Sequence, residues 1–247
     1  MNGIKGNSRL QKLEFLLDQV DKIHLRDVAE ILNVSEMTIR RDLSNHQSIF
    51  TLLGGYIVKE SQKANNYFLL EQQDKNINEK MYIGKLAASL IENDDIVFFD
   101  CGTTISFIAS QIPNSIKFTA VCCSMNTFLI LQEKTNCEII LCGGKYSRDN
   151  ALVSSIQNDS ILDSICTTKA FIATSGVHPK YGLTCFRFNE AQIKQKAIAK
   201  TMQAITIFDH TKLNEVHPAY IGTTSMFDLA ICNKTIPESF GFSRVIS

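Results

Sequence analysis

The chain has 247 residues, 45% of them hydrophobic and 20% charged, which is typical of a globular protein with a substantial core. Its 25 basic residues balance its 25 acidic ones, so overall charge gives no indication of a nucleic-acid partner, and any such contact must come from local charge placement. The N-terminus lacks the apolar run of a signal peptide, and no apolar stretch is long enough to cross a bilayer. We therefore expect a cytoplasmic protein without membrane contact.

The eight cysteines are scattered along the chain. None forms a Cys-x-x-Cys pair, and histidine is too sparse nearby for a zinc pattern. Most of these cysteines lie in apolar runs, which is typical of small buried thiols in a reducing compartment. The sequence accordingly predicts no metal site and no cofactor.

The first 59 residues predict a DNA-binding domain. Apolar residues recur at helical spacing in 10–20 and again in 25–32, and Ser35 can cap a third helix two residues after the second one ends. Two short apolar runs then flank Gly54 and Gly55, which predicts a β-hairpin because glycine tolerates the positive φ of a tight turn. Three helices followed by a hairpin are typical of a winged helix-turn-helix.

The third predicted helix carries the sequence SEMTIRRDL, residues 35–43. Arginine is the side chain best suited to bidentate contact with guanine, and a recognition helix places such side chains in its first turns. Adjacent helical residues point about 100° apart, so one arginine can read a base while the other binds phosphate or pairs with Asp42. A solvated surface helix with a few ion pairs is the alternative. The candidate DNA-contacting residues are His24, Ser35, Glu36, Met37, Thr38, Arg40, Arg41, Gly54, Gly55 and Tyr56.

Residues 60–77 are polar without strong periodicity and are predicted to be a linker. The remainder, 78–247, alternates between strand-like and helix-like stretches, which predicts an α/β domain with a mostly parallel sheet flanked by helices. The expected strands are 95–100, 117–124, 138–144, 169–176, 204–210 and 227–233. The expected helices are 80–92, 105–112, 126–134 and 189–203.

Polar residues and glycines follow most of these strands. Open α/β sheets bind ligands at the carboxyl ends of their strands, and free backbone N–H groups at a helix start suit a phosphate. Glu190 and Lys194 lie one helical turn apart, on one face, where a surface ion pair is the plain interpretation. Ordinary turns are the alternative for the strand ends. The candidate ligand-binding residues at the strand ends are Asp100, Gly102, Thr103, Thr104, Ser124, Asn126, Gly143, Gly144, Gly176, Asp209 and Lys212.

These motifs together resemble the DeoR family of bacterial transcriptional regulators. SEMTIRRDL fills the family's recognition-helix pattern, and FFDCGTT, LCGG and DHTK resemble its sensor motifs. Glu190 and Lys194 in NEAQIK resemble the family's Glu and Lys that reach the sugar, which adds them to the candidate ligand-binding residues. One departure is the absence of a basic residue before the wing glycines, where this chain has TLLGGYIV and so looks most like the deoxyribose-responsive members.

The resemblance implies a fold like that of ribose phosphate isomerase, and a homo-oligomeric repressor that binds double-stranded operator DNA of deoxyribose catabolic genes. It also implies that a phosphorylated sugar, deoxyribose 5-phosphate, is the effector that releases the repressor. Two alternatives stay open: a regulator, including an activator, that responds to another sugar phosphate, and a sugar phosphate isomerase that carries a DNA-binding domain.

Overall fold

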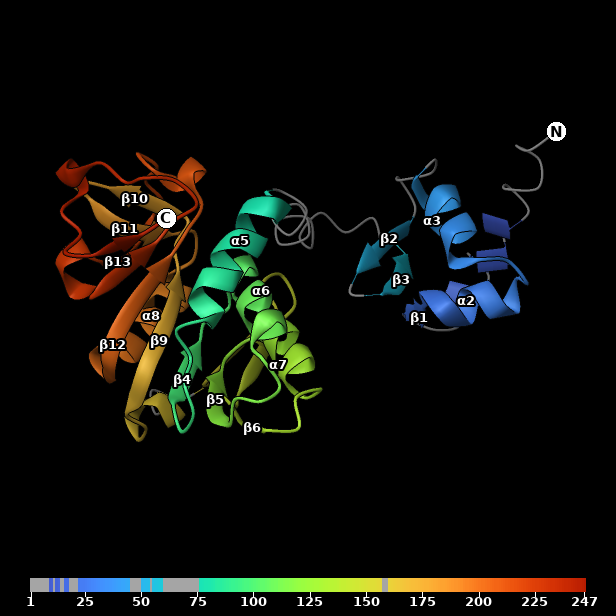
Figure 1. The fold of residues 1–247 in the computed structure, drawn as a ribbon, viewed down its shortest axis with the longest axis horizontal. Helices are drawn as coiled ribbons and strands as arrows, with labels where there is room; N and C mark the ends of the chain where they lie inside the picture. Colours follow the sequence, from blue (N-terminus) through green and yellow to red (C-terminus); the bar gives the residue numbers. More distant parts are fainter. Residues whose placement is uncertain are drawn as a thin grey trace. The chain divides into compact units, whose positions relative to one another are not determined.

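The computed structural model divides the chain into two compact units, Met1–Ala64 and Asn65–Ser247, which are described separately here (Figure 1). The division falls within the segment predicted to be a linker. Residues 60–75 lie outside the described part of the chain, and so does Gly54. The structure describes residues 9–10, 12–13, 16–17, 22–44, 50–53, 55–59, 76–156 and 160–247.

The first unit is a helix-turn-helix with a three-stranded sheet. Residues 9–10, 12–13 and 16–17 are helical, and α2 (Leu25–Ile31) and α3 (Glu36–Ser44) follow them. The predicted hairpin is confirmed as β2 (Phe50–Leu53) and β3 (Tyr56–Lys59), but β3 also pairs with β1 (Lys22–His24), which the sequence did not reveal. Three residues are too few to display a period of two, so β1 is visible only through its partner.

The core of this unit explains why α3 holds a fixed orientation. Ile39 and Leu43 of α3 are buried against apolar residues of the other helices and of the sheet. The guanidinium of Arg9 donates to both carboxylate oxygens of Asp42, with Nε–Oδ2 at 2.7 Å and Nη2–Oδ1 at 3.0 Å. Asp42 was one possible partner of Arg40 or Arg41, and the structure shows that Arg9, from the first helix, engages both of its oxygens.

The second unit is built on a parallel sheet, as predicted, but with seven strands instead of the expected six. Its order is β15-β14-β12-β9-β4-β5-β6, so the chain starts in the middle, moves outward to β6, and returns to the other side of β4 (Figure 1). Both neighbours of β4 are parallel to it. The strands are β4 (Ile96–Phe99), β5 (Phe118–Cys122), β6 (Cys137–Leu141), β9 (Thr167–Ala173), β12 (Thr201–Ile207), β14 (Leu229–Ile231) and β15 (Val245–Ile246).

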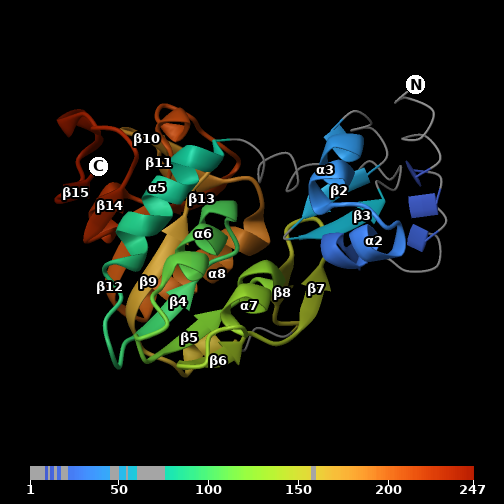
Figure 2. The same cartoon turned by 45° about the vertical axis from the view of Figure 1, so that its right-hand side comes forward.

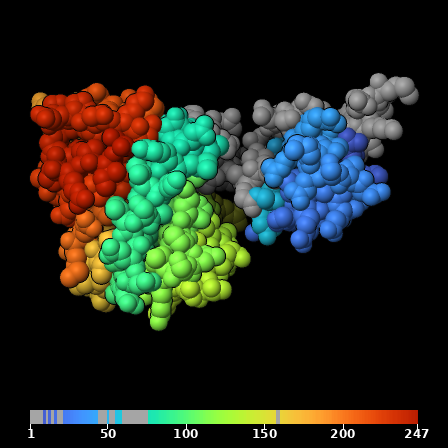
Figure 3. Space-filling view, in the orientation of Figure 1, coloured from blue at the N-terminus to red at the C-terminus, as the bar shows by residue number. Residues whose placement is uncertain are grey.

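Helices cover both faces of this sheet (Figures 1 and 2). On one face lie α5 (Ile77–Ala88), α6 (Thr103–Gln111) and α7 (Met125–Leu131), and α8 (Phe188–Ala199) lies on the other. Side chains of β4 alternate between the two faces. Val97 and Phe99 pack in the core beneath α5, α6 and α7, and Phe98 packs in the core beneath α8. The outer side of α5 forms a band on the surface of this unit (Figure 3).

The sequence extended the last helix too far. Residues 201–203 were predicted to be helical, but Thr201 begins β12, because its partner strand β9 pairs with it from Thr167 onward. Small elements were missed because each has only two to four residues: β7 (Lys145–Ser147), β8 (Leu152–Ser154), β10 (Gly176–His178), β11 (Gly182–Cys185), β13 (Ala219–Gly222), β15, and the 3-10 helices η1 (Ile161–Asp163), η2 (His210–Lys212), η3 (Thr224–Met226) and η4 (Glu238–Phe240).

Among the described residues, no helix has the length and apolarity that a membrane span requires.

We predict that Asp42→Ala lowers the free energy of unfolding of the first unit by about 1 kcal/mol, because it leaves Arg9 without a carboxylate partner at a partly solvated position. Thermal unfolding followed by circular dichroism would measure the change. Asp27→Ala is the matched control, because Asp27 is an exposed carboxylate on α2, and an equal effect of both variants would contradict the assignment.

Candidate functional site

The start of α3 is fixed by a side-chain cap. Ser35 Oγ accepts the backbone N–H of Thr38 at 3.2 Å, and the hydroxyl groups of these two residues lie 2.9 Å apart. This is the cap that the sequence predicted, and it satisfies one of the donors that a helix start leaves open.

One side of α3 is exposed along its length. Met37 is 73% exposed, and Arg40 and Arg41 are exposed as well, whereas Thr38 is half-buried. These four residues line a shallow surface hollow. Glu36 is also exposed, so the candidate reading residues of α3 lie away from the core of this unit, as a helix that enters a DNA groove requires.

His24 and the wing turn have a structural explanation of their own. His24 Nδ1 accepts the backbone N–H of Arg26 at 3.2 Å at the start of α2, and its ring meets Tyr56 edge-on at 5.0 Å. Gly55 has a φ of +86°, and a Cβ there would lie 3.2 Å from His24 Nε2. The exposed edge of Tyr56 remains available for contact with DNA.

We predict that Arg40→Ala weakens binding to the specific operator by about 5- to 150-fold, the range expected when one bidentate base contact is lost. The measurement is a titration of operator and scrambled duplexes at one fixed salt concentration. Arg26→Ala removes an exposed arginine from α2 and serves as the control. If Arg40→Ala weakened both duplexes equally, Arg40 would contact phosphate rather than a base.

The second unit holds a pocket where the strand order reverses. β4 and β9 are neighbours in the sheet, but the strand that follows β4 lies on one side of this pair and the strand that follows β9 in the sheet lies on the other. Open α/β sheets bind ligands in the crevice at such a point. Pocket-lining residues follow both strands directly: Cys101, Gly102, Thr103 and Thr104 after β4, and Thr174 and Ser175 after β9.

A buried ion pair lies at the base of this pocket. Lys194 Nζ, on α8, donates to Asp100 Oδ2 and also to the carbonyl of Ala173 at 3.1 Å. The backbone N–H of Ala173 donates to the same Asp100 oxygen at 3.0 Å. Asp100 is 0% exposed and Lys194 is 2% exposed. The pair therefore joins β4, β9 and α8 at one point.

The charge state of Lys194 is set by this pairing. Burial is the largest single effect on Lys194 and lowers its pKa, but the combined attraction of Asp100, Cys101, Glu190 and Cys185 outweighs burial and raises the pKa above its ordinary value. A raised lysine pKa means that Lys194 stays protonated at neutral pH and loses its proton only at strongly alkaline pH.

The start of α6 is an open cluster of donors facing the pocket. Gly102 occupies the N-cap position, no side chain caps the helix, and its first turn has no acidic residue. A Cβ at Gly102 would lie 2.1 Å from the Cβ of Ala173, so glycine is required for α6 to approach β9 this closely. Uncapped N–H groups and the hydroxyl groups of Thr103 and Thr104 suit an anion.

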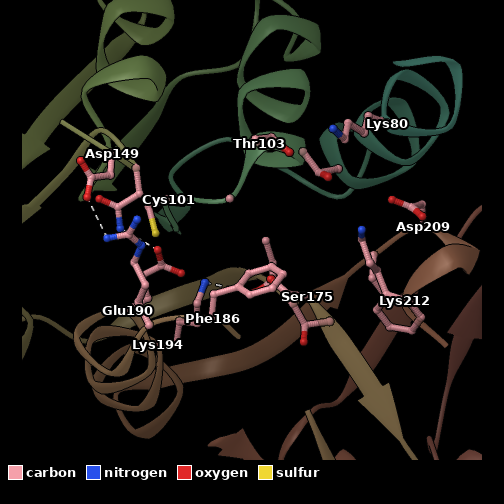
Figure 4. A pocket seen from close by; sticks show the side chains of 17 residues that line it. Lys80, Cys101, Thr103, Asp149, Ser175, Phe186, Glu190, Lys194, Asp209 and Lys212 are labelled. Carbon is pink, nitrogen blue, oxygen red and sulfur yellow. Dashed lines mark hydrogen bonds and ion pairs between the residues drawn. The ribbon is translucent and has the colours of Figure 1, made fainter. Parts of the chain in front are cut away.

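Two lysines lie together on one side of the pocket. Figure 4 shows Lys80 of α5 and Lys212 of η2 there, with Asp209 near them. Asp209 Oδ1 is occupied by the backbone N–H of Thr211 at 3.0 Å and by Asn76 Nδ2 at 3.3 Å. Within the described ranges, the ammonium group of Lys212 has no hydrogen bond or ion pair, so it is available to a ligand.

The opposite side of the pocket is closed by the turn between β7 and β8. Asp149 Oδ2 accepts from Arg187 Nη1 at 3.0 Å, and Asn150 Nδ2 donates to Glu190 Oε1 at 2.6 Å. Figure 4 places Asp149, Glu190 and Lys194 on this side, away from Lys80 and Lys212. Lys80, Lys212 and Asp209 therefore lie at one end of the pocket, and the paired groups Asp149–Arg187 and Asn150–Glu190 lie at the other (Figure 4).

The structure gathers eight of the thirteen predicted ligand-binding residues around this pocket. Asp100 lies behind the lining through its contact with Lys194. The other seven line the pocket directly: Gly102, Thr103, Thr104, Glu190, Lys194, Asp209 and Lys212.

The remaining five predicted residues are absent from that lining: Ser124, Asn126, Gly143, Gly144 and Gly176. Two of them have structural explanations. A Cβ at Gly144, whose φ is +133°, would lie 2.1 Å from the carbonyl oxygen of Ser154. A Cβ at Gly176 would lie 2.5 Å from the carbonyl oxygen of Glu215. Close backbone approach, rather than ligand contact, accounts for these two glycines.

Lys80, Asn150 and Arg187 line the pocket although sequence reasoning missed them. Lys80 had a signal: it shares the buried face of α5 with Ile83 and Ala87, and a lysine at a buried helical position calls for an explanation. The other two lie in short connections, where no periodicity marks a functional position.

Six of the eight cysteines are buried, which matches the predicted role of small apolar residues. Asp100, Cys101 and Cys123 bring three potential metal-ligand atoms within 4.8 Å of one another. Contact with the Cys101 thiol, together with burial, raises the pKa of Cys123 well above its ordinary value. Lys194 already supplies the positive charge beside Asp100, so this arrangement fits neutral packed thiols better than metal ligands.

We predict that Lys194→Met lowers the free energy of unfolding of the second unit by about 3–5 kcal/mol, because Asp100 is left buried without its counter-ion. Because the pKa of Lys194 is raised, the loss is expected to be equal at pH 6 and pH 8. Denaturant unfolding followed by circular dichroism measures it. Adding Asp100→Asn to Lys194→Met is expected to recover part of the loss, and a double variant less stable than the single one would contradict the pairing.

Comparison with known proteins places both units in one family. The DeoR-like helix-turn-helix domain matches residues 9–62, and the DeoR C-terminal sensor domain matches residues 75–234. The deoxyribose operon repressor of Escherichia coli strain K12 is 44% identical over 92% of this chain and 90% of its own length. The HTH-type transcriptional repressor GlcR of Bacillus subtilis strain 168 is 31% identical over 94% of this chain and 90% of its own length.

Solved structures show only a distant similarity. The ribose 5-phosphate isomerase A of Methanocaldococcus jannaschii is 14% identical, covers 56% of this chain and 55% of its own, and gives a TM-score of 0.42. A TM-score this low supports no conclusion about chemistry or ligand. The two matched domains and the whole-length relatives are the findings that decide: the chain belongs to the DeoR family and is a DNA-binding transcriptional repressor.

Proposed function

We propose that this repressor controls genes of deoxyribose catabolism and is released from its operator by deoxyribose 5-phosphate. The observation that carries the proposal is the arrangement of the pocket, with two lysines and an uncapped helix start at one end and the hydrogen-bonding groups of Asp149, Asn150, Arg187 and Glu190 at the other. A small phosphorylated sugar has the same two ends, a dianionic phosphate and a set of hydroxyl groups. The 44% identity to the deoxyribose operon repressor of Escherichia coli supports this choice of sugar.

The phosphate is assigned to the cationic end. Lys212 has no partner among the described residues, and the N–H groups at the start of α6 have no side-chain cap. Charge-assisted hydrogen bonds from an ammonium group and from a helix start are the contacts that phosphate prefers. With the phosphate there, the sugar ring extends toward Glu190 and the β7–β8 turn.

Release from DNA requires differential binding. A sugar that binds the DNA-free and DNA-bound forms equally shifts nothing, so deoxyribose 5-phosphate must bind the DNA-free form more tightly. We also propose that the repressor acts as a homo-oligomer on repeated half-sites, because one recognition helix reads only a few base pairs.

The repressor relatives argue against an isomerase, and two carboxylates of the pocket region are partly engaged in structural contacts. Aldose–ketose isomerisation needs a carboxylate free to remove a carbon-bound proton. Asp100 Oδ2 is held by Lys194 and by a backbone N–H, and Glu190 accepts from Asn150. Turnover of ribose 5-phosphate by the purified chain would revive the isomerase hypothesis. A regulator of another sugar phosphate, acting as repressor or activator, would instead respond to a different ligand in the same assay.

We predict that deoxyribose 5-phosphate weakens binding of the full chain to its operator at fixed salt, and that Lys212→Gln abolishes this response without changing operator affinity in the absence of sugar. The measurement is fluorescence anisotropy of labelled operator with and without the sugar. Lys117→Gln is the matched control, because Lys117 is an exposed lysine just before β5, at the opposite end of the sheet from the pocket.

Three other outcomes separate the parts of this proposal. Operator binding that ignores deoxyribose 5-phosphate but responds to another sugar phosphate would contradict the effector and leave the repressor intact. A response that survives in Lys212→Gln would contradict the phosphate placement. An equal loss of response in Lys117→Gln would show that any change of charge on this unit has the same effect.

A further inference from the structure

We propose that Asn150 is the residue by which the sensor recognises the sugar end of its ligand, accepting a hydrogen bond from the hydroxyl group farthest from the phosphate. This inference rests on the proposed function, since it assumes that the phosphate lies at the Lys80–Lys212 end. It adds a specificity residue that none of the sequence motifs contains.

The amide of Asn150 has only one orientation that its neighbours allow. Its Nδ2 lies 2.6 Å from Glu190 Oε1. A carboxylate oxygen accepts and does not donate, so the NH₂ group must face Glu190 and the carbonyl oxygen must face away from it. Asn150 is 2% exposed and lines the pocket.

The carbonyl oxygen of Asn150 is a buried acceptor that lacks a partner. Oδ1 has no hydrogen bond in the described part of the chain. Buried polar atoms are nearly always hydrogen-bonded, so an orphaned one at a pocket wall indicates a missing donor. Asp100 Oδ1 is likewise buried without a partner, but Asp100 lies behind the pocket lining. The unpaired carbonyl of Asn150 belongs to a residue that lines the pocket, so it calls for a ligand that brings a hydroxyl group.

The backbone holds Asn150 in place. Ala151, the next residue, has a φ of +51°, a conformation that residues other than glycine rarely adopt. The carbonyl of Ala151 accepts the N–H of Met125 at 2.9 Å, and Asp149 is paired with Arg187. The residues on both sides of Asn150 are thus anchored to α7 and to the start of α8. A costly backbone conformation maintained by its surroundings is typical of a position with a function.

The geometry selects one hydroxyl group. In a furanose 5-phosphate whose phosphate lies at the cationic end, the hydroxyl on C1 is the one that extends farthest toward Asn150 and Glu190. That hydroxyl is a donor in the cyclic form of the sugar. Its removal should therefore weaken binding to a chain that carries Asn150 and should matter little to a chain that lacks it.

The test is a two-by-two comparison of ligands and variants by isothermal titration calorimetry on the full chain. The ligands are deoxyribose 5-phosphate and 1,2-dideoxyribose 5-phosphate, which lacks only the C1 hydroxyl. We expect the wild-type chain to prefer the first ligand by about tenfold, the upper range for one neutral hydrogen bond, and Asn150→Ala to prefer it by less than about twofold. Asn189→Ala, the same change at an exposed asparagine beside Glu190, should keep the tenfold preference.

Each other outcome overturns a defined claim. Equal binding of the two sugars by the wild-type chain overturns the inference without any variant. A tenfold preference retained by Asn150→Ala also overturns it. Asp149→Asn breaks the ion pair with Arg187 but keeps the Asn150 amide. If this variant also lost the preference for deoxyribose 5-phosphate, the preference would depend on the position of the β7–β8 turn rather than on the Asn150 amide. If the wild-type chain binds neither sugar, the proposed effector fails and this inference fails with it.

Discussion

The ion pair between Asp100 and Lys194 is the interaction on which the second unit depends most. It joins the end of β4, the end of β9 and the middle of α8 within one set of contacts. Neither charge is tolerable in the core alone, so each fixes the place of the other. The pair also defines the base of the pocket, because β4 and β9 are the two strands between which the sheet reverses its order.

From this base the pocket acquires its polarity through elements that are far apart in the sequence. α5 contributes Lys80, α6 its uncapped start, η2 Lys212, and the β7–β8 turn Asp149 and Asn150. One oxygen of the Asp100 carboxylate is held by Lys194 and by the backbone of Ala173, so this side chain fixes the base of the pocket. A ligand that binds in such a pocket can act by shifting an equilibrium between two forms of the protein.

The first unit follows a similar logic on a smaller scale. Arg9 holds Asp42, Ser35 caps α3, and the buried residues Ile39 and Leu43 orient the helix. Each of these contacts leaves the opposite side of α3, with Arg40 and Arg41, exposed to solvent. A rigid helix that presents long side chains outward is suited to reading a DNA groove, because its backbone loses little conformational entropy on binding.

The sequence by itself determined the two-unit organisation, the winged helix-turn-helix and the parallel sheet, because periodicity, the Ser35 cap and the Gly-Gly turn are local signals. It also marked Asp100, Gly102 to Thr104, Glu190, Lys194, Asp209 and Lys212, since strand ends and one helix face can be found along the chain. Only the tertiary structure decided that Arg9 pairs with Asp42, that Gly144 and Gly176 serve backbone packing, and that Lys80 and Asn150 belong to the pocket. These facts depend on contacts between segments separated by tens of residues, and no local pattern encodes which distant segments will meet.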